Sequence, residues 1–191
     1  NAKAGRLQFG DAAGGASGLV QVDGHVVARA GDVTLIAPQV QTGTSALVQA
    51  PDGSVILAAG QHAEITSRGL GGVRLLVQAP SDRAVNLGRL TADAVGLFAS
   101  TLRHSGQIDV QAVQAEGGRV ELKALERAEI DGQVTARRLQ GLGGLFHATA
   151  RQVQVDSTAR VDASGTYGGG EILVGGGWQG QDSRLANAQQ T

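Results

Sequence analysis

The sequence contains no cysteine and no methionine, and its aromatic residues are three phenylalanines, one tyrosine and one tryptophan among 191 residues. Without cysteine, disulfides, thiolate catalysis and thiolate-bound metals are excluded. Charged residues make up 17% of the chain and the net charge is -1. Nucleic-acid binding is disfavoured, because it requires a clustered positive charge. No apolar run approaches the roughly 18 residues that a membrane-spanning helix requires.

Glycine is abundant, with 30 residues in the chain. Five aromatic rings cannot fill an ordinary globular core, because large rings normally supply much of its buried area. Hydrophobic residues nevertheless make up 41% of the sequence. Most of them are Ala, Val, Leu and Ile. A thin core of small aliphatic side chains suits an elongated molecule better than a spherical one.

Short alternating apolar triplets recur along the sequence. Their first residues are separated by 22, 18, 22, 25, 25 and 27 positions. A period of about 20 to 25 residues with some slippage is typical of a solenoid built from strands. The triplets are Val33–Leu35, Val55–Leu57, Val73–Leu75, Val95–Leu97, Val120–Leu122, Leu145–His147 and Ile172–Val174.

Turn signals lie beside these triplets. Glycine or Asp-Gly precedes most of them, and we expect these glycines to adopt positive φ where each coil turns sharply. A second unit, a small polar or glycine turn followed by a short alternating strand, lies between the triplets. Each coil is therefore expected to contain at least two strands. The second units cover residues 86–90, 105–108, 131–134 and 159–163.

The pattern predicts an all-β chain that forms a parallel β-helix, or β-solenoid, of about eight coils. Helix is expected in less than about a tenth of the residues. A β-sandwich is the structural alternative, because it also uses many short strands. The chain begins at Asn1 without the pattern of a signal peptide, so we expect a processed product or a fragment. Residues 1–191 are interpreted as a single segment of a longer repetitive protein.

The triplets also predict a register for the core. In three of the triplets, the first and third residues are expected to point inward and to stack on their counterparts in the next coil. The inward residues predicted in this way are Val55, Leu57, Val95, Leu97, Val120 and Leu122.

Three phrases of the sequence resemble the coils of filamentous-haemagglutinin-type exoproteins. They lie at residues 33–40, at residues 50–60, and at residues 163–176 together with Asn187-Ala188. The resemblance extends from about Phe9 to Thr191. Members of this family are large adhesins of Gram-negative bacteria that are exported by two-partner secretion.

The resemblance implies a right-handed parallel β-helix that is secreted and exposed at the cell surface. It implies attachment to cells, surfaces or matrix polysaccharide, with roles in biofilm formation and virulence. It also implies two partners: the outer-membrane pore that exports the parent chain, and a surface glycan or a host or matrix receptor. The Asn-Pro-Asn motifs of the family's N-terminal secretion domain do not occur here. The segment is therefore expected to follow that domain.

The leading functional hypothesis is a non-enzymatic, structural and adhesive rod segment. One alternative is a polysaccharide-degrading enzyme on the same fold, which would place acidic groups on one face. The other is a self-assembling filament subunit, because open ends of a coil stack are unpaired edges that invite end-to-end association.

Candidate catalytic and metal-binding residues are scattered. The four histidines His25, His62, His104 and His147 are 37, 42 and 43 positions apart, without the close spacing usual for metal ligands. Acidic candidates are Asp93 with Asp109, or a denser group with basic residues interspersed. The alternating signs of that group favour a solvated face with weak ion pairs, so no catalytic residue, cofactor or metal is assigned. The group comprises Glu116, Glu121, Glu126 and Glu129 with Lys123 and Arg127.

Four residues are candidates for contact with a glycan: Arg137, Arg138, Tyr167 and Trp178. The two arginines form a basic cluster that suits either an anionic glycan or a solvated corner. The two aromatic residues flank a glycine-rich stretch. They suit either sugar binding or covering of the end of the coil stack, and the sequence leaves both alternatives open.

Overall fold

The computed structural model describes residues 7–9, 18–77, 79–112, 118–138, 141–182 and 185–191. These residues form strands and two short 3-10 turns, η2 (Leu70–Gly72) and η3 (Trp178–Gly180), and no α-helix occurs among them. The prediction of an all-β chain with very little helix is confirmed. The strands are β1 (Leu7–Phe9), β2 (Leu19–Val22), β3 (His25–Val27), β4 (Val33–Ala37), β5 (Gln39–Thr42), β6 (Leu47–Ala59), β7 (His62–Ile65), β8 (Val73–Val77), β9 (Arg83–Asn86), β10 (Arg89–His104), β11 (Gln107–Ala112), β12 (Arg119–Ile130), β13 (Gln133–Arg138), β14 (Leu145–Thr149), β15 (Gln152–Val155), β16 (Arg160–Asp162) and β17 (Glu171–Val174).

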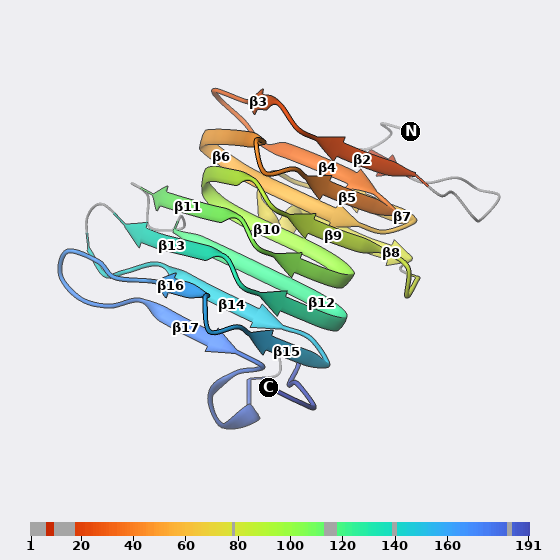
Figure 1. Ribbon diagram of the computed structural model, residues 1–191. Coiled ribbons are helices and arrows are strands. Elements are labelled where there is room, and N and C mark those ends of the chain that lie inside the picture. Colours follow the sequence, from red (N-terminus) through yellow and green to blue (C-terminus); the bar gives the residue numbers. More distant parts are fainter. Residues whose placement is uncertain (1–6, 10–17, 78, 113–117, 139–140, 183–184) are drawn as a thin grey trace.

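Fourteen of the described strands pair in parallel and form three ladders (Figure 1). The first ladder contains residues 19–22, 39–42, 83–86, 101–104, 127–130 and 152–155. The second contains residues 25–27, 47–50, 89–92, 107–112, 133–138 and 160–162. The third contains residues 33–37, 55–59, 94–99, 119–124, 145–149 and 171–174.

The chain visits the three ladders in the same order again and again, so the fold is β-helix-like. Long strands bend around the corners, and β10 contributes a rung to all three ladders. The parallel pairing rules out the β-sandwich alternative, because sandwiches are built from antiparallel sheets. Each ladder has six rungs in the described part of the chain, and the predicted number of about eight coils is not confirmed.

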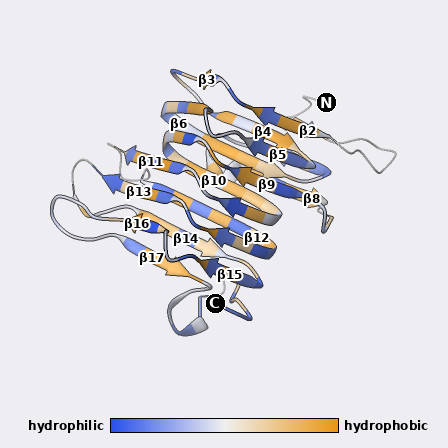
Figure 2. Cartoon of the chain, in the orientation of Figure 1, coloured by the Kyte–Doolittle hydropathy of each residue, from blue (hydrophilic) through white to orange (hydrophobic). Residues whose placement is uncertain are grey.

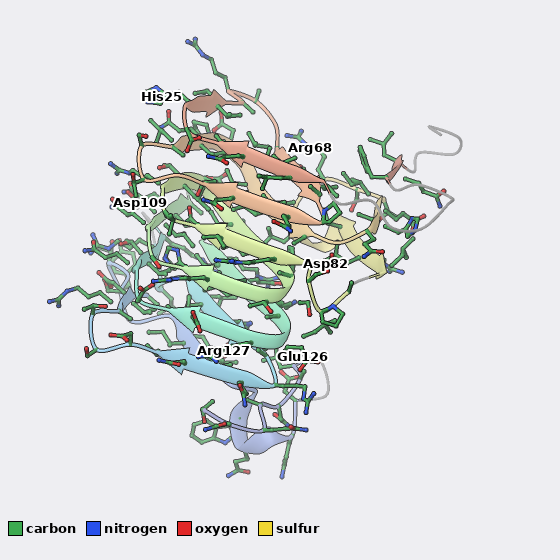
Figure 3. The ribbon with its side chains drawn as sticks, turned by 45° about the vertical axis from the view of Figure 1, so that its right-hand side comes forward. His25, Arg68, Asp82, Asp109, Glu126 and Arg127 are labelled. Carbon is green, nitrogen blue, oxygen red and sulfur yellow. The ribbon has the colours of Figure 1, made fainter. Side chains whose placement is uncertain are left out.

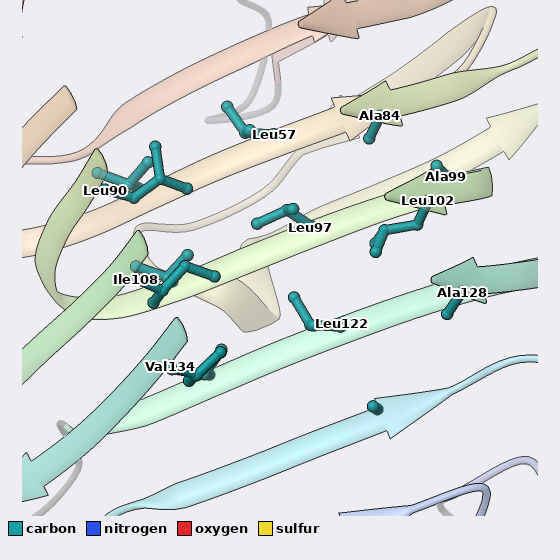
Figure 4. Close-up of a cluster of buried hydrophobic side chains, with 14 of the residues drawn as sticks. Leu57, Ala84, Leu90, Leu97, Ala99, Leu102, Ile108, Leu122, Ala128 and Val134 are labelled. Atoms are coloured by element: carbon teal, nitrogen blue, oxygen red, sulfur yellow. The ribbon is translucent and has the colours of Figure 1, made fainter. Parts of the chain in front are cut away.

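The core lies between the three ladders and consists of stacked aliphatic side chains. All six residues predicted to point inward are fully buried. In the third ladder, Leu57, Leu97 and Leu122 occupy the same register position on successive rungs (Figure 4). Apolar residues alternate with polar ones along several strands, as Figure 2 shows. The thin aliphatic core inferred from the composition is therefore present.

One apolar triplet was assigned to the wrong part of the fold. Val73–Leu75 belongs to β8, which pairs antiparallel with β7 instead of adding a rung to the coil stack. Together with η2, β8 packs on the outside of the third ladder, where Ile56 and Ala58 are buried against Leu70. Alternating apolar residues indicate a half-buried strand of either kind, so the pattern alone did not distinguish this insertion from a coil.

Glycine occupies the coil corners for two physical reasons. Gly118 has a positive φ of 74°, as expected for a sharp turn. Gly88, Gly106 and Gly132 follow one another at the corner between the first and second ladders, and none has a positive φ. A Cβ on Gly106 would lie 2.1 Å from the carbonyl oxygen of Gly88. These glycines are therefore required by the close approach of successive coils.

Replacing Gly106 with alanine is expected to destabilise the protein by about 1–3 kcal/mol, because the added methyl group meets backbone that cannot move independently. Gly24 lies at the same corner in the first described coil, and a Cβ there would meet nothing within 4 Å. Gly24→Ala is therefore the matched control, and its stability should stay close to that of the parent. Chemical denaturation of both variants measures the difference, and equal stabilities would contradict the stacking of these corners.

The first ladder contains a polar column inside the core. The Thr42 hydroxyl donates to Oδ1 of Asn86 at 2.6 Å, and Nδ2 of Asn86 lies 3.0 Å from Nδ1 of His104. Nε2 of His104 lies 3.2 Å from the carbonyl oxygen of Gln133. All three side chains are fully buried. Burial lowers the pKa of His104 to about 4, from an ordinary value of 6.5.

Candidate functional site

A groove of about 760 Å³ follows the corner between the second and third ladders. The turns that precede successive rungs of the third ladder build one wall of this corner groove, and the segment around η2 builds the other. Acidic and basic side chains are present in equal number. The charged residues of the corner groove are Asp32, Asp52, Asp93, Arg68, Arg119 and Arg138.

Asp32 joins the coil stack to the segment that precedes η2. Its carboxylate accepts hydrogen bonds from the backbone N–H groups of Ser54 and Gly69, both at 2.9 Å. Nε of Arg68 lies 3.8 Å from the same carboxylate. Because its oxygens are used in these contacts, Asp32 fixes the shape of the groove.

Asp93 lies in the wall of the groove that the coil turns build. Partial burial raises the pKa of Asp93, and the negative charge of Asp52 raises it further. The sequence paired Asp93 with Asp109, but Asp109 lies on the outer face of the second ladder, where Arg89 contacts it at 3.3 Å. Asp93 lines the corner groove and Asp109 does not, so this groove does not bring the two residues together.

The denser acidic group lies on outward-facing positions, where its members are paired with basic residues. Glu121 contacts Lys123 at 2.6 Å and Arg119 at 3.4 Å. The remaining pairs are Glu129 with Arg127 at 2.7 Å and Glu126 with Arg151 at 3.0 Å. Glu126 and Arg127 project from the surface in Figure 3. Glu116 lies outside the described residues.

The four candidates for glycan contact are not brought together. Arg137 donates a hydrogen bond to Asp162, which holds the pKa of that carboxyl well below its usual range. Arg138 lines the corner groove. Tyr167 and Trp178 are each 80% exposed, and they lie in the segments before and after β17. Contact of these four residues with a glycan stays a prediction.

The end of the coil stack is approached by the segment from Asn187 to Gln190. The backbone N–H of Val153 donates to the carbonyl oxygen of Gln190 at 3.0 Å, and Ala188 packs against the core. With only a fifth of their surface buried, Tyr167 and Trp178 do not close this end.

The histidines occupy four different surroundings. His25 is exposed, His62 lies on β7 in the small antiparallel sheet, and His104 is in the core. Nε2 of His147 lies 2.6 Å from the Glu171 carboxylate. Within the described ranges, no group of three or more histidine or acidic side chains is arranged to hold a metal ion. The same ranges contain no helix with the length and apolarity needed to cross a membrane.

Comparison with known proteins relates the chain to a solved structure. No protein-family model matches the sequence, and no curated protein is significantly similar to it. The crystal structure of the HMW1 secretion domain from Haemophilus influenzae is similar, with a TM-score of 0.83 and 26% sequence identity. The match covers 97% of this chain and 51% of that one. The chain therefore spans about half the length of the secretion domain that it resembles.

Proposed function

We propose that this chain is a segment of a large secreted adhesin that Gram-negative bacteria export by two-partner secretion, and that it contributes an extended, adhesive rod at the cell surface. The observation that supports this most is the set of three parallel ladders, together with the likeness to a secretion domain over nearly the whole chain. Both agree with the resemblance of the sequence to filamentous-haemagglutinin-type exoproteins.

The architecture suits a mechanical role. Hydrogen bonds between rungs run along the stack, and the aliphatic core continues from one coil to the next, which makes such a structure stiff along its length. The outer faces are broad, and the corner groove is open and polar. In this role the segment is non-enzymatic, and incubation with acidic and neutral polysaccharides should release no new reducing ends or unsaturated products. Release of either product would instead support the polysaccharide-degrading alternative.

The right-handed coil and the export pore as partner are part of the same proposal. Two positions within the parent chain are considered. The missing Asn-Pro-Asn motifs favour a position after the secretion domain, whereas the likeness to a secretion domain supports a position inside one. Deleting residues 18–191 from the parent chain separates the two: export persists if the segment follows the domain, and export is lost if the segment belongs to it.

The proposal predicts where the native chain is found. An antibody raised against these residues should detect a band far above 19.3 kDa in culture supernatant and on intact cells, and protease treatment of those cells should remove the surface band. A cytoplasmic marker protein serves as the control for cell integrity. A protease-resistant intracellular band would contradict the proposal.

Self-assembly is the second candidate function, favoured by the last described rungs. Val155, Ile172 and Val174 occupy inward register positions there, yet they are 48%, 47% and 37% exposed. Such an apolar edge accepts a further coil, either from a continuing chain or from another copy. Sedimentation of the purified parent chain distinguishes the two, because only assembly between copies depends on concentration.

A further inference from the structure

Strand β8 forms one edge of the small antiparallel sheet, whose order is β1–β7–β8. Strand β7 lies in the middle, with β1 on one side and β8 on the other. In the described part of the chain, β8 pairs with β7 alone. The opposite side of β8 therefore presents backbone N–H and C=O groups that can accept another strand.

An apolar groove of about 180 Å³ runs between β8 and the outer face of the third ladder. An apolar cavity of about 150 Å³ accepts a molecule of the size of benzene, so this β8 groove has room for one or two aliphatic side chains. It is open to solvent at Leu125, which is 52% exposed. The β8 groove is lined by Val73, Leu75, Phe98, Ala99, Lys123, Ala124 and Leu125.

The groove exists because the small sheet covers the outer face of β10 but not that of β12, the next rung of the third ladder, where apolar residues continue. Outward-facing Ala58 and Phe98 of β6 and β10 pack in the apolar cluster under η2 and β8. The register partner of Phe98 on the next rung is Lys123, and its ammonium group lies 2.6 Å from the carboxylate of Glu121. Leu125 lies two residues further along β12 and extends the apolar surface beyond the edge of the sheet.

We propose that β8 binds an extended segment of a partner polypeptide as an added strand. The segment lies over β12, its backbone pairs with the open edge of β8, and apolar side chains at every second position enter the β8 groove. This mode of recognition obtains affinity from backbone hydrogen bonds and selectivity from alternate side chains.

The space around β8 decides which kind of partner fits. A strand added to β8 lies over β12, whose Lys123 and Leu125 line the β8 groove. A second folded copy that presented its own β8 with the same face inward would bring its coil stack into the space that β12 fills. The added strand must therefore belong to a segment that has no folded structure packed on the side that faces β12. The other edge of the sheet already holds such a strand: β1, with the sequence Leu7-Gln8-Phe9, is separated from its partner β7 by more than fifty residues.

The test uses a short synthetic peptide in which valine alternates with threonine. It should bind the intact chain and slow amide hydrogen exchange at residues 73–77. Leu125→Glu places a charge in the groove and should weaken binding by about tenfold or more. The matched control is Leu76→Glu: Leu76 lies on β8 and is 56% exposed, but it does not line the groove, so binding should be unchanged.

A peptide of the same sequence with methylated backbone nitrogens should not bind, because it lacks the donors of a paired strand. Both exposed positions tolerate substitution without unfolding, which circular dichroism and thermal melting verify. Absence of peptide binding, equal binding by Leu125→Glu, or unchanged exchange at residues 73–77 would overturn the proposal. A concentration-dependent dimer that forms without peptide and is abolished by Leu125→Glu would assign the edge to a second copy instead.

Discussion

Lowering the pH from about 7 to about 4 is expected to destabilise the coil stack by about 3 kcal/mol through the side chain of His104 alone. The imidazole is buried, and its pKa in the folded protein is about 4 instead of 6.5. The unfolded chain therefore takes up a proton below pH 6.5 while the folded chain remains neutral. Stability from this residue is full above pH 6.5 and decreases down to about pH 4.

The hydrogen bonds explain why the neutral form is required. Oδ1 of Asn86 accepts a hydrogen bond from the hydroxyl of Thr42. The amide nitrogen of Asn86 therefore faces His104 and must donate a hydrogen bond to Nδ1 of the imidazole. Nε2 then carries the proton and donates to the carbonyl oxygen of Gln133. A second proton on Nδ1 would face the amide of Asn86. The charged group that acts on His104 is Asp131, which raises its pKa, but less than burial lowers it.

Urea denaturation at several pH values measures this effect. His104→Gln should remove most of the loss between pH 6.5 and about 4, whereas exposed His25 provides the control, and His25→Gln should keep the parent profile. If His104→Gln loses stability with acid as steeply as the parent, the neutral polar column is not the cause.

Leu97→Asp is expected to cost at least about 3 kcal/mol and to unfold the adjoining coils, because it places a carboxylate in the aliphatic stack. Leu97 is fully buried and lies in register with Leu57 on one side and Leu122 on the other. In a stacked fold each coil is supported by its neighbours, so damage to a central rung spreads to both sides.

Gln154→Asp is the matched control for this substitution. Gln154 is an exposed strand residue of the first ladder, and its side chain lies beside Arg127, which donates to it at 3.1 Å. The new carboxylate stays in water beside a positive charge, so stability should change by less than about 0.5 kcal/mol. A Leu97→Asp protein as stable as Gln154→Asp would contradict the inward register of the third ladder.

Sequence patterns identified two of the three ladders. The third ladder was found because Val, Leu and Ile occupy its inward positions, and the second because a glycine or polar turn precedes each of its strands. The first ladder was missed. Its inward positions hold Ala84, Thr42, Asn86 and His104 as well as aliphatic residues, so the apolar alternation that signals a strand is interrupted.

The candidate site could be predicted only in part, since it is assembled from single residues of different coils. Asp52, Asp93 and Arg119 lie close to the same corner but are 41 and 26 positions apart, because the insertion between β6 and β10 disturbs the period. Arg138 was identified as a candidate for glycan contact because it forms a basic cluster with Arg137, and it lines the corner groove. Aromatic identity suggested Tyr167 and Trp178, and the triplet Ile172–Val174, which became β17, already lay between them in the sequence.

The parallel register of the coil stack can be tested directly with paired cysteines, since the natural chain contains none. Gln107 and Gln133 are register partners on the outer face of the second ladder. Neighbouring strands lie about 4.8 Å apart, within the range that a disulfide spans. Gln107→Cys with Gln133→Cys should therefore form a disulfide on mild oxidation of the folded protein. Gln107→Cys with Thr135→Cys, displaced by two residues to about 8 Å, should not, and preferential cross-linking of this second pair would contradict the stacked parallel coils.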